Sequence, residues 1–147
     1  MAIPISAYID ITSKVVQGTV GSRDFSGLVF TKDTMLATVP SAYADIKTDY
    51  AAGKPVALTQ DGIKACFASD TDIYKYASNY FGYNGGNHAP SVLNVACVLS
   101  TGTDVYETAL TAYNRVLGQF TNFGACAFIG NFELGAAESG GLLDVAN

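Results

Sequence analysis

The chain has 147 residues, of which 49% are hydrophobic and only 14% charged, and its formal net charge is −5. This length suits a single domain with one buried core. The eight basic residues are scattered along the chain and form no basic face, which excludes nucleic acid and anionic membrane surfaces as partners.

The low content of charged residues indicates that parts of the surface are covered by partners. An ordinary soluble domain has about 25% charged residues, so the polar surface of this chain is thin. The alternative is a monomer whose surface consists of Ser, Thr, Asn and Gly.

No apolar run approaches the roughly 20 residues that span a bilayer. The N-terminus lacks the basic region of an export signal, so we expect a cytoplasmic chain.

Three cysteines, Cys66, Cys97 and Cys126, lie about thirty residues apart and each has apolar neighbours. They lack the CxxC spacing of a zinc or redox site. We predict three buried thiols in a reducing compartment.

Residues 1–21 predict an extended arm that contains a strand. Residues 8–12 alternate in polarity, and the isoleucines of the arm are too apolar to be left in water. A frayed terminus is the alternative. We therefore expect the arm to form an intersubunit strand, whose candidate contact residues are Ile3, Ile5, Tyr8, Ile9 and Ile11.

The next segments alternate between short strands and short helices. Residues 25–31 predict a buried strand. The pattern is weaker over residues 32–55, where apolar residues at helical spacing permit one short helix before Gly53. Residues 56–59 predict a brief strand, and residues 61–68 a two-turn helix capped by Thr59 or Asp61.

A second helix follows, with the clearest boundaries in the chain. Ser69 and Asp72 have the spacing of a capping box, and Gly82 is placed to end the helix. Between them lies one apolar stripe, made of Ile73, Tyr76, Ala77, Tyr80 and Phe81.

The last part of the chain predicts a strand, a long helix and another strand. Residues 92–99 are nearly all apolar, which is typical of a central strand buried on both faces. Asp104 and Glu107 are predicted to open the long helix, and residues 123–129 form the next strand. This succession indicates a parallel pair with a right-handed crossover. We predict an α/β fold: a mixed, partly parallel sheet flanked by amphipathic helices, with an extended N-terminal arm.

Residues 22–147 are expected to form the α/β core domain. The apolar pattern around Gly140 and Gly141 is still building at Asn147. The sequence leaves open whether the core domain is complete at its C-terminus.

Residues that could carry chemistry are few and isolated. There is no phosphate-binding GxxxxGK[ST] motif and no GxGxxG motif. His88 is the only histidine, Asp70 and Asp72 lack the further ligands of a calcium loop, and Ser139 lacks the glycine of a nucleophile elbow. We therefore expect no catalytic site, no metal site and no cofactor, and the protein is predicted not to be an enzyme.

Five segments follow one another in a characteristic order: residues 1–12, 22–31, 76–82, 89–96 and 122–130. In this order they resemble the sheath-like tail proteins of contractile-tailed bacteriophages. The resemblance covers most of the chain except about residues 32–55, although family members are longer. The chain is then a fragment or shortened relative of a sheath, or a different tail or particle protein with the same α/β core.

This resemblance implies a virion structural protein that assembles in the host bacterial cytoplasm and resides in the phage tail. Its subunits would form stacked rings around a tail tube, so the implied partners are copies of itself and the tail tube protein. The terminal arms would add strands to neighbouring subunits. No cofactor and no catalysis are implied.

A second hypothesis comes from a different class of protein. Aromatic and amide residues gather in the glycine-rich turn after the capped helix, where they could form a small ligand-binding or carbohydrate-binding site. The candidate residues are Tyr83, Asn84, Asn87 and His88.

Overall fold

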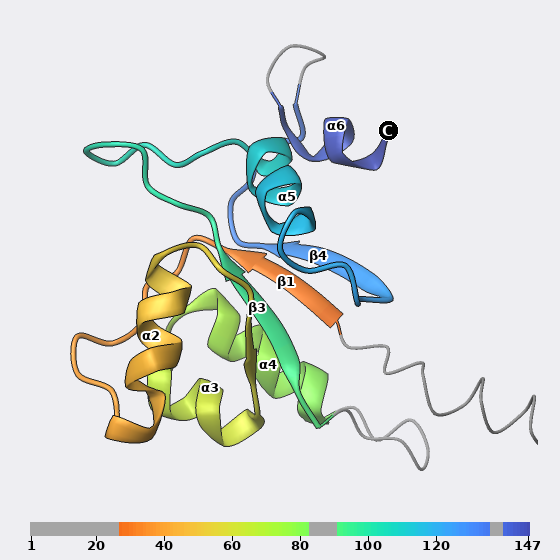
Figure 1. The fold of residues 1–147 in the computed structure, drawn as a ribbon. Coiled ribbons are helices and arrows are strands. Elements are labelled where there is room, and N and C mark those ends of the chain that lie inside the picture. Colours follow the sequence, from red (N-terminus) through yellow and green to blue (C-terminus); the bar gives the residue numbers. More distant parts are fainter. Residues whose placement is uncertain (1–26, 83–90, 136–139) are drawn as a thin grey trace, which may run out of the picture.

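The computed structural model describes residues 27–82, 91–135 and 140–147. Within them, one mixed sheet carries helices on both faces, which confirms the expected α/β fold (Figure 1). The strands lie in the order β2-β3-β1-β4. Their bounds are Gly27–Thr31 for β1, Val56–Leu58 for β2, Leu93–Cys97 for β3 and Ala125–Ile129 for β4.

The first strand, β1, lies in the interior of the sheet and organises the others. It pairs in parallel with β3 on one side and with β4 on the other, while β2 pairs antiparallel to β3. The strands β3 and β4 are therefore parallel, as predicted, but they are not neighbours. The crossover that joins β3 to β4 passes over β1. The order of strand, helix and strand along the chain does not predict this intervening strand.

The two faces of the sheet are covered by different parts of the chain. Figure 1 shows α2, α3 and α4 on one face and α5 on the other. Their bounds are Ala44–Ala51 for α2, Gln60–Cys66 for α3, Asp72–Gly82 for α4 and Ala109–Leu117 for α5. The 3-10 turn Ser41–Tyr43 leads into α2, and a short helix α6, Leu142–Ala146, lies against α5.

Each face has its own hydrophobic cluster, because alternate strand residues point to opposite sides. Side chains on one side of β1 and β3, including Val29 and Val95, pack with Ile63 and Ile73 of the first group of helices. The other side packs against α5, through Leu28, Phe30, Ala96, Val98, Ala112 and Val116. All residues of β3 are buried, which confirms the prediction of a central strand.

The N-terminal ends of α3 and α4 are capped in different ways. The Thr59 hydroxyl accepts a hydrogen bond from the Gly62 N–H at 3.1 Å, so the predicted cap by Thr59 is confirmed. The predicted capping box of Ser69 and Asp72 is wrong, since α4 begins only at Asp72. Instead, the Asp33 carboxylate, from the loop after β1, accepts a hydrogen bond from the Ile73 N–H at 2.8 Å.

The predicted start of the long helix at Asp104 is also wrong. Asp104 has a left-handed φ of 66°, which does not continue a helix. The helix α5 begins five residues later, at Ala109, where the Thr108 hydroxyl accepts a hydrogen bond from the Thr111 N–H. Glu107 does not cap the helix because its carboxylate is held by Arg115.

The side chain of Arg115 contacts three separate chain segments near the carboxyl ends of the parallel strands. Its Nη2 donates to Glu107 Oε1 at 2.6 Å and to the Cys97 carbonyl at 2.7 Å, and Nη1 donates to the Gly53 carbonyl. Glu107 Oε1 also accepts a hydrogen bond from the Leu99 N–H at 3.1 Å. This arginine therefore ties β3 both to the loop before α5 and to the turn after α2.

The backbone at Gly53 makes this contact possible. Its φ of 76° is a conformation that side-chain-bearing residues rarely adopt. A Cβ atom at this position would lie 2.6 Å from Arg115 Nη1. Glycine at this turn is thus required both by the backbone conformation and by the close approach of the guanidinium group.

Replacing Arg115 by Ala should lower the free energy of unfolding by about 3 kcal/mol, because it leaves the largely buried Glu107 carboxylate and two carbonyls without their donor. Urea unfolding followed by circular dichroism measures this change. The matched control is Lys54→Ala, which removes an exposed ion pair with Asp49 and should change stability by less than about 1 kcal/mol. Equal effects of the two substitutions would contradict the structural role of Arg115.

Candidate functional site

The strand β4 forms an open edge of the sheet. Within the described residues it pairs only with β1, and its other side has no strand beside it. Its residues, ACAFI, carry no charge, and none of them is fully buried. An apolar edge strand with free main-chain donors and acceptors is a ready template for a strand from another chain. The edge of β4 is therefore a candidate interaction surface.

The opposite edge of the sheet is much less suited to such pairing. The strand β2 has only three residues, and it lies directly between Pro55 and the helix cap Thr59. A short edge strand flanked by proline is a common protection against pairing with other chains. The two edges of this sheet are therefore not equivalent.

A first pocket, of about 310 Å³, lies at the carboxyl ends of β1 and β3. The chain leaves β1 towards α2 and leaves β3 towards α5, on opposite faces, which creates the crevice where open α/β sheets bind ligands. Its apolar walls include Met35, Tyr50 and Leu99. The Tyr50 hydroxyl donates to the Asp33 carbonyl at 2.5 Å, and burial, with the nearby Cys97 thiol, raises the pKa of Tyr50.

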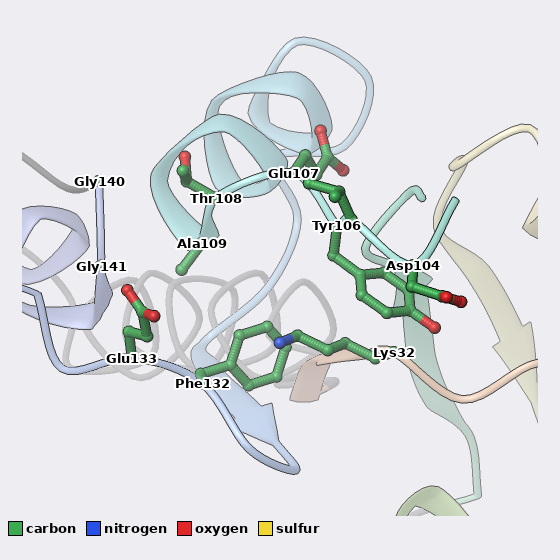
Figure 2. Close-up of a pocket in the computed structure, with 11 residues that line it drawn as sticks. Lys32, Asp104, Tyr106, Glu107, Thr108, Ala109, Phe132, Glu133, Gly140 and Gly141 are labelled. Atoms are coloured by element: carbon green, nitrogen blue, oxygen red, sulfur yellow. The ribbon is translucent and has the colours of Figure 1, made fainter. Parts of the chain in front are cut away.

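A second pocket, of about 290 Å³, opens between the loop before α5 and the loop after β4 (Figure 2). We call it the Lys32 pocket. Lys32 Nζ lies 4.7 Å from the centre of the Phe132 ring and 5.3 Å from that of Tyr106, and it donates to the Asn131 carbonyl at 2.8 Å. The charge of this lysine is thus held by two aromatic faces and a carbonyl.

The carboxylates of the Lys32 pocket differ in their surroundings. Glu107 is held by Arg115, at 2.6 Å. Figure 2 shows the Glu133 carboxylate reaching towards Ala109 and Gly141, whereas the carboxylate of Asp104 points away from Lys32. Among the described residues, Glu133 has no ion-pair partner for its side chain. The pocket therefore has two carboxylates, those of Glu133 and Asp104, that a cation could approach.

The described residues do not assemble a catalytic or metal-binding group. No cluster of three His, Cys, Asp or Glu side chains suitable for a metal ion occurs among them. Asp70 and Asp72 are exposed at the start of α4. His88 and Ser139 lie outside the described residues.

The residues predicted for the two interaction sites also lie outside the described part of the chain. These are the arm residues Ile3, Ile5, Tyr8, Ile9 and Ile11, and the turn residues Tyr83, Asn84, Asn87 and His88. Lys32, Tyr106 and Phe132 were not among the residues predicted from the sequence. Lys32 and Phe132 follow closely on the ends of β1 and β4, so their positions after predicted strands were the available signal.

The prediction of three buried thiols is correct for two cysteines and wrong for one. Cys66 and Cys97 are buried, whereas Cys126 is exposed on β4. An apolar sequence around a cysteine predicts burial only for an interior strand. Cys126 is exposed because β4 lies at the edge of the sheet.

No model of a known protein family, no curated protein and no solved structure matches this chain. Among the described residues, no helix has the length and apolar character needed to cross a membrane.

Thiol labelling of the native protein should modify Cys126 first and leave Cys66 and Cys97 protected, because burial blocks access to both and raises the pKa of their thiols. Partial desolvation raises the pKa of Cys126 to about 11. The thiolate is the reactive form, so its labelling rate should rise about tenfold per pH unit between roughly pH 7 and 10.

Labelling with an absorbance reagent, followed by mass spectrometry of the peptides, measures both the site and the rate. Protein unfolded in guanidinium chloride is the control, in which all three cysteines should react. Equal rates for the three thiols in the native protein would contradict the assigned burial.

Proposed function

We propose that this chain is a structural subunit of a contractile phage tail sheath, which self-assembles into stacked rings around a tail tube through strand exchange by terminal arms. The observation that carries the proposal is the open, uncharged edge of β4. An edge of this kind is costly for a protein that stays alone in water, because it invites pairing with other chains. Its presence is understandable if another chain covers it.

The sequence contains a segment suited to covering that edge. The arm residues Ile3, Ile5, Ile9 and Ile11 occupy odd positions, so in an extended strand they would share one face. Main-chain hydrogen bonds to β4 would provide affinity, and these side chains would provide an apolar contact. The arm of one copy is therefore proposed as the strand that pairs with β4 of another.

The assignment to a phage tail rests on the resemblance of five segments to sheath-like tail proteins. Three of them cover β1, most of β3 and β4, which form the parallel part of the sheet. The proposed partners are copies of the chain and a tail tube protein, and the proposed location is the virion. The proposal involves neither catalysis nor a cofactor.

Deleting residues 1–20 should abolish assembly without unfolding the core, because it removes the proposed intersubunit strand. Negative-stain microscopy and light scattering measure assembly, and circular dichroism checks the fold. Rings or tubes formed by the truncated protein would contradict the role of the arm. A monodisperse monomer of the full chain at high concentration would contradict the proposed function itself.

Substituting Cys126→Lys should raise the protein concentration required for assembly by roughly tenfold, because a charge on an edge strand opposes pairing with an apolar strand. Light scattering at increasing protein concentration measures the shift. Ala57→Lys is the matched control, since Ala57 is the exposed central residue of β2 at the opposite edge. If both substitutions have the same effect, β4 is not the acceptor edge.

A second candidate function is binding of a small ligand, for which the crevice between β1 and β3 is the supporting feature. The pocket there has apolar walls and a suitable volume, and it lies where α/β sheets bind ligands. This candidate predicts a monomer that binds a ligand saturably. Light scattering of the full chain distinguishes it from the subunit proposal.

A further inference from the structure

Exposed hydrophobic residues are concentrated around the Lys32 pocket. The large hydrophobic residues most exposed among the described ones are Leu134, Val105 and Leu143, at 69%, 56% and 55%. Val105 lines the pocket, and Leu134 directly follows its lining residue Glu133. The Leu143 N–H donates to the Leu134 carbonyl, which keeps these two residues together. We call Val105, Leu134 and Leu143 the apolar rim of the pocket. Exposed hydrophobic residues that lie close to one another mark protein interaction sites.

The charge at the pocket selects what can bind there. Three carboxylates line the pocket. Glu107 is held by Arg115, whereas Glu133 and Asp104 have no ion-pair partner among the described residues, and Glu133 is the one that follows β4. Lys32 is engaged by two rings and a carbonyl. A fitting partner therefore carries one cation next to apolar side chains.

Lys14 is the basic residue that the proposed arm would bring to this pocket. The basic residues of the described part hold ion pairs or carbonyls, or are exposed on α3 and α4. Lys14 follows the arm segment 3–12, which the proposed function pairs with β4, and two valines follow it. The pocket is lined by residues just beyond the carboxyl end of β4, so the arm would supply a cation beside apolar side chains at that place.

We infer that the Lys32 pocket with its apolar rim is the docking site for residues 14–16 of a second copy of this chain. Lys14 would bind the Glu133 carboxylate, and Val15 and Val16 would cover the rim. This inference rests on the proposed function, in which the preceding residues of the same arm pair with β4.

Docking of Lys14 also sets the direction of the arm. Residues 132 and 133 follow the carboxyl end of β4, and β4 itself spans about 16 Å. If arm residues 3–12 pair in parallel with β4, Lys14 arrives beyond that end, near Glu133. Antiparallel pairing would place it at the opposite end of the strand. The inferred arm strand is therefore parallel to β4.

The same geometry favours an arm from a neighbouring copy. A parallel strand from the same chain would need a crossover that returns to the start of β1 over one face of the sheet. Helices already cover both faces (Figure 1). An arm supplied by another copy needs no such crossover.

Reversing the two charges tests the contact in the full chain. Lys14→Glu and Glu133→Lys should each raise the concentration required for half-maximal assembly about fivefold. The double variant should return it close to the value of the unmodified protein, since the opposite charges face each other again. Light scattering measures assembly, and circular dichroism checks that each variant is folded. Lys75→Glu and Asp61→Lys, which make the same charge changes at exposed positions on α4 and α3, should cause no shift.

Two outcomes separate this inference from the proposed function. If deletion of residues 1–20 abolishes assembly but charge reversal at Lys14 does not weaken it, the docking site is wrong and the arm proposal stands. A double variant no better than the single ones also overturns the contact. If the unmodified chain does not assemble, the proposed function and this inference both fail.

A disulfide trap identifies the source of the arm. With Lys14→Cys and Glu133→Cys in a Cys126→Ser background, oxidation should produce covalent multimers on non-reducing electrophoresis. A disulfide within a single chain would overturn docking by a second copy. No more cross-linking than in the control pair Lys14→Cys with Asp61→Cys, on α3 beside β2, would overturn the contact itself.

Discussion

The structure depends on the contact between Arg115 and Glu107 at the carboxyl edge of the sheet. The loops that follow parallel strands all leave the sheet at the carboxyl ends of the strands. These loops contain main-chain carbonyls and amides that have no partner within the sheet. Arg115 binds the carbonyls of Cys97 and Gly53, and Glu107 accepts from the Leu99 amide. One buried ion pair thus positions the loops that form both pockets.

The sequence predicted elements whose signals are local. The strand β3 and the apolar face of α4 were predicted because burial imposes a regular pattern on neighbouring residues. Features that depend on distant residues were not predicted. Glu107 was predicted to open a helix because its ion-pair partner, Arg115, lies eight positions later in the chain. The position of β1 between β3 and β4 cannot be seen in the order of the elements along the chain. Cys126 was misjudged for the same reason, since edge position is a property of the whole sheet.

The candidate surfaces show the same division between local and distant information. That residues 125–129 carry no charge can be seen in the sequence. That they form an edge strand, which pairs only with β1 among the described residues, cannot. The Lys32 pocket joins residues that follow β1, β3 and β4. Each of these residues looks ordinary alone, and only the parallel arrangement of the strands brings them together.

The unequal edges of the sheet limit how many neighbours a chain can have through strand pairing. The edge at β4 can accept one strand, while the three-residue β2 beside Pro55 is a poor acceptor. In the proposed assembly, each chain would give one arm and receive one strand, so it would bind two neighbours through strand pairing. Two such contacts per chain build a reciprocal pair, a closed ring or an unbranched thread. A tube made in this way would need at least one further interface, chemically different from strand pairing, to join one ring or thread to the next.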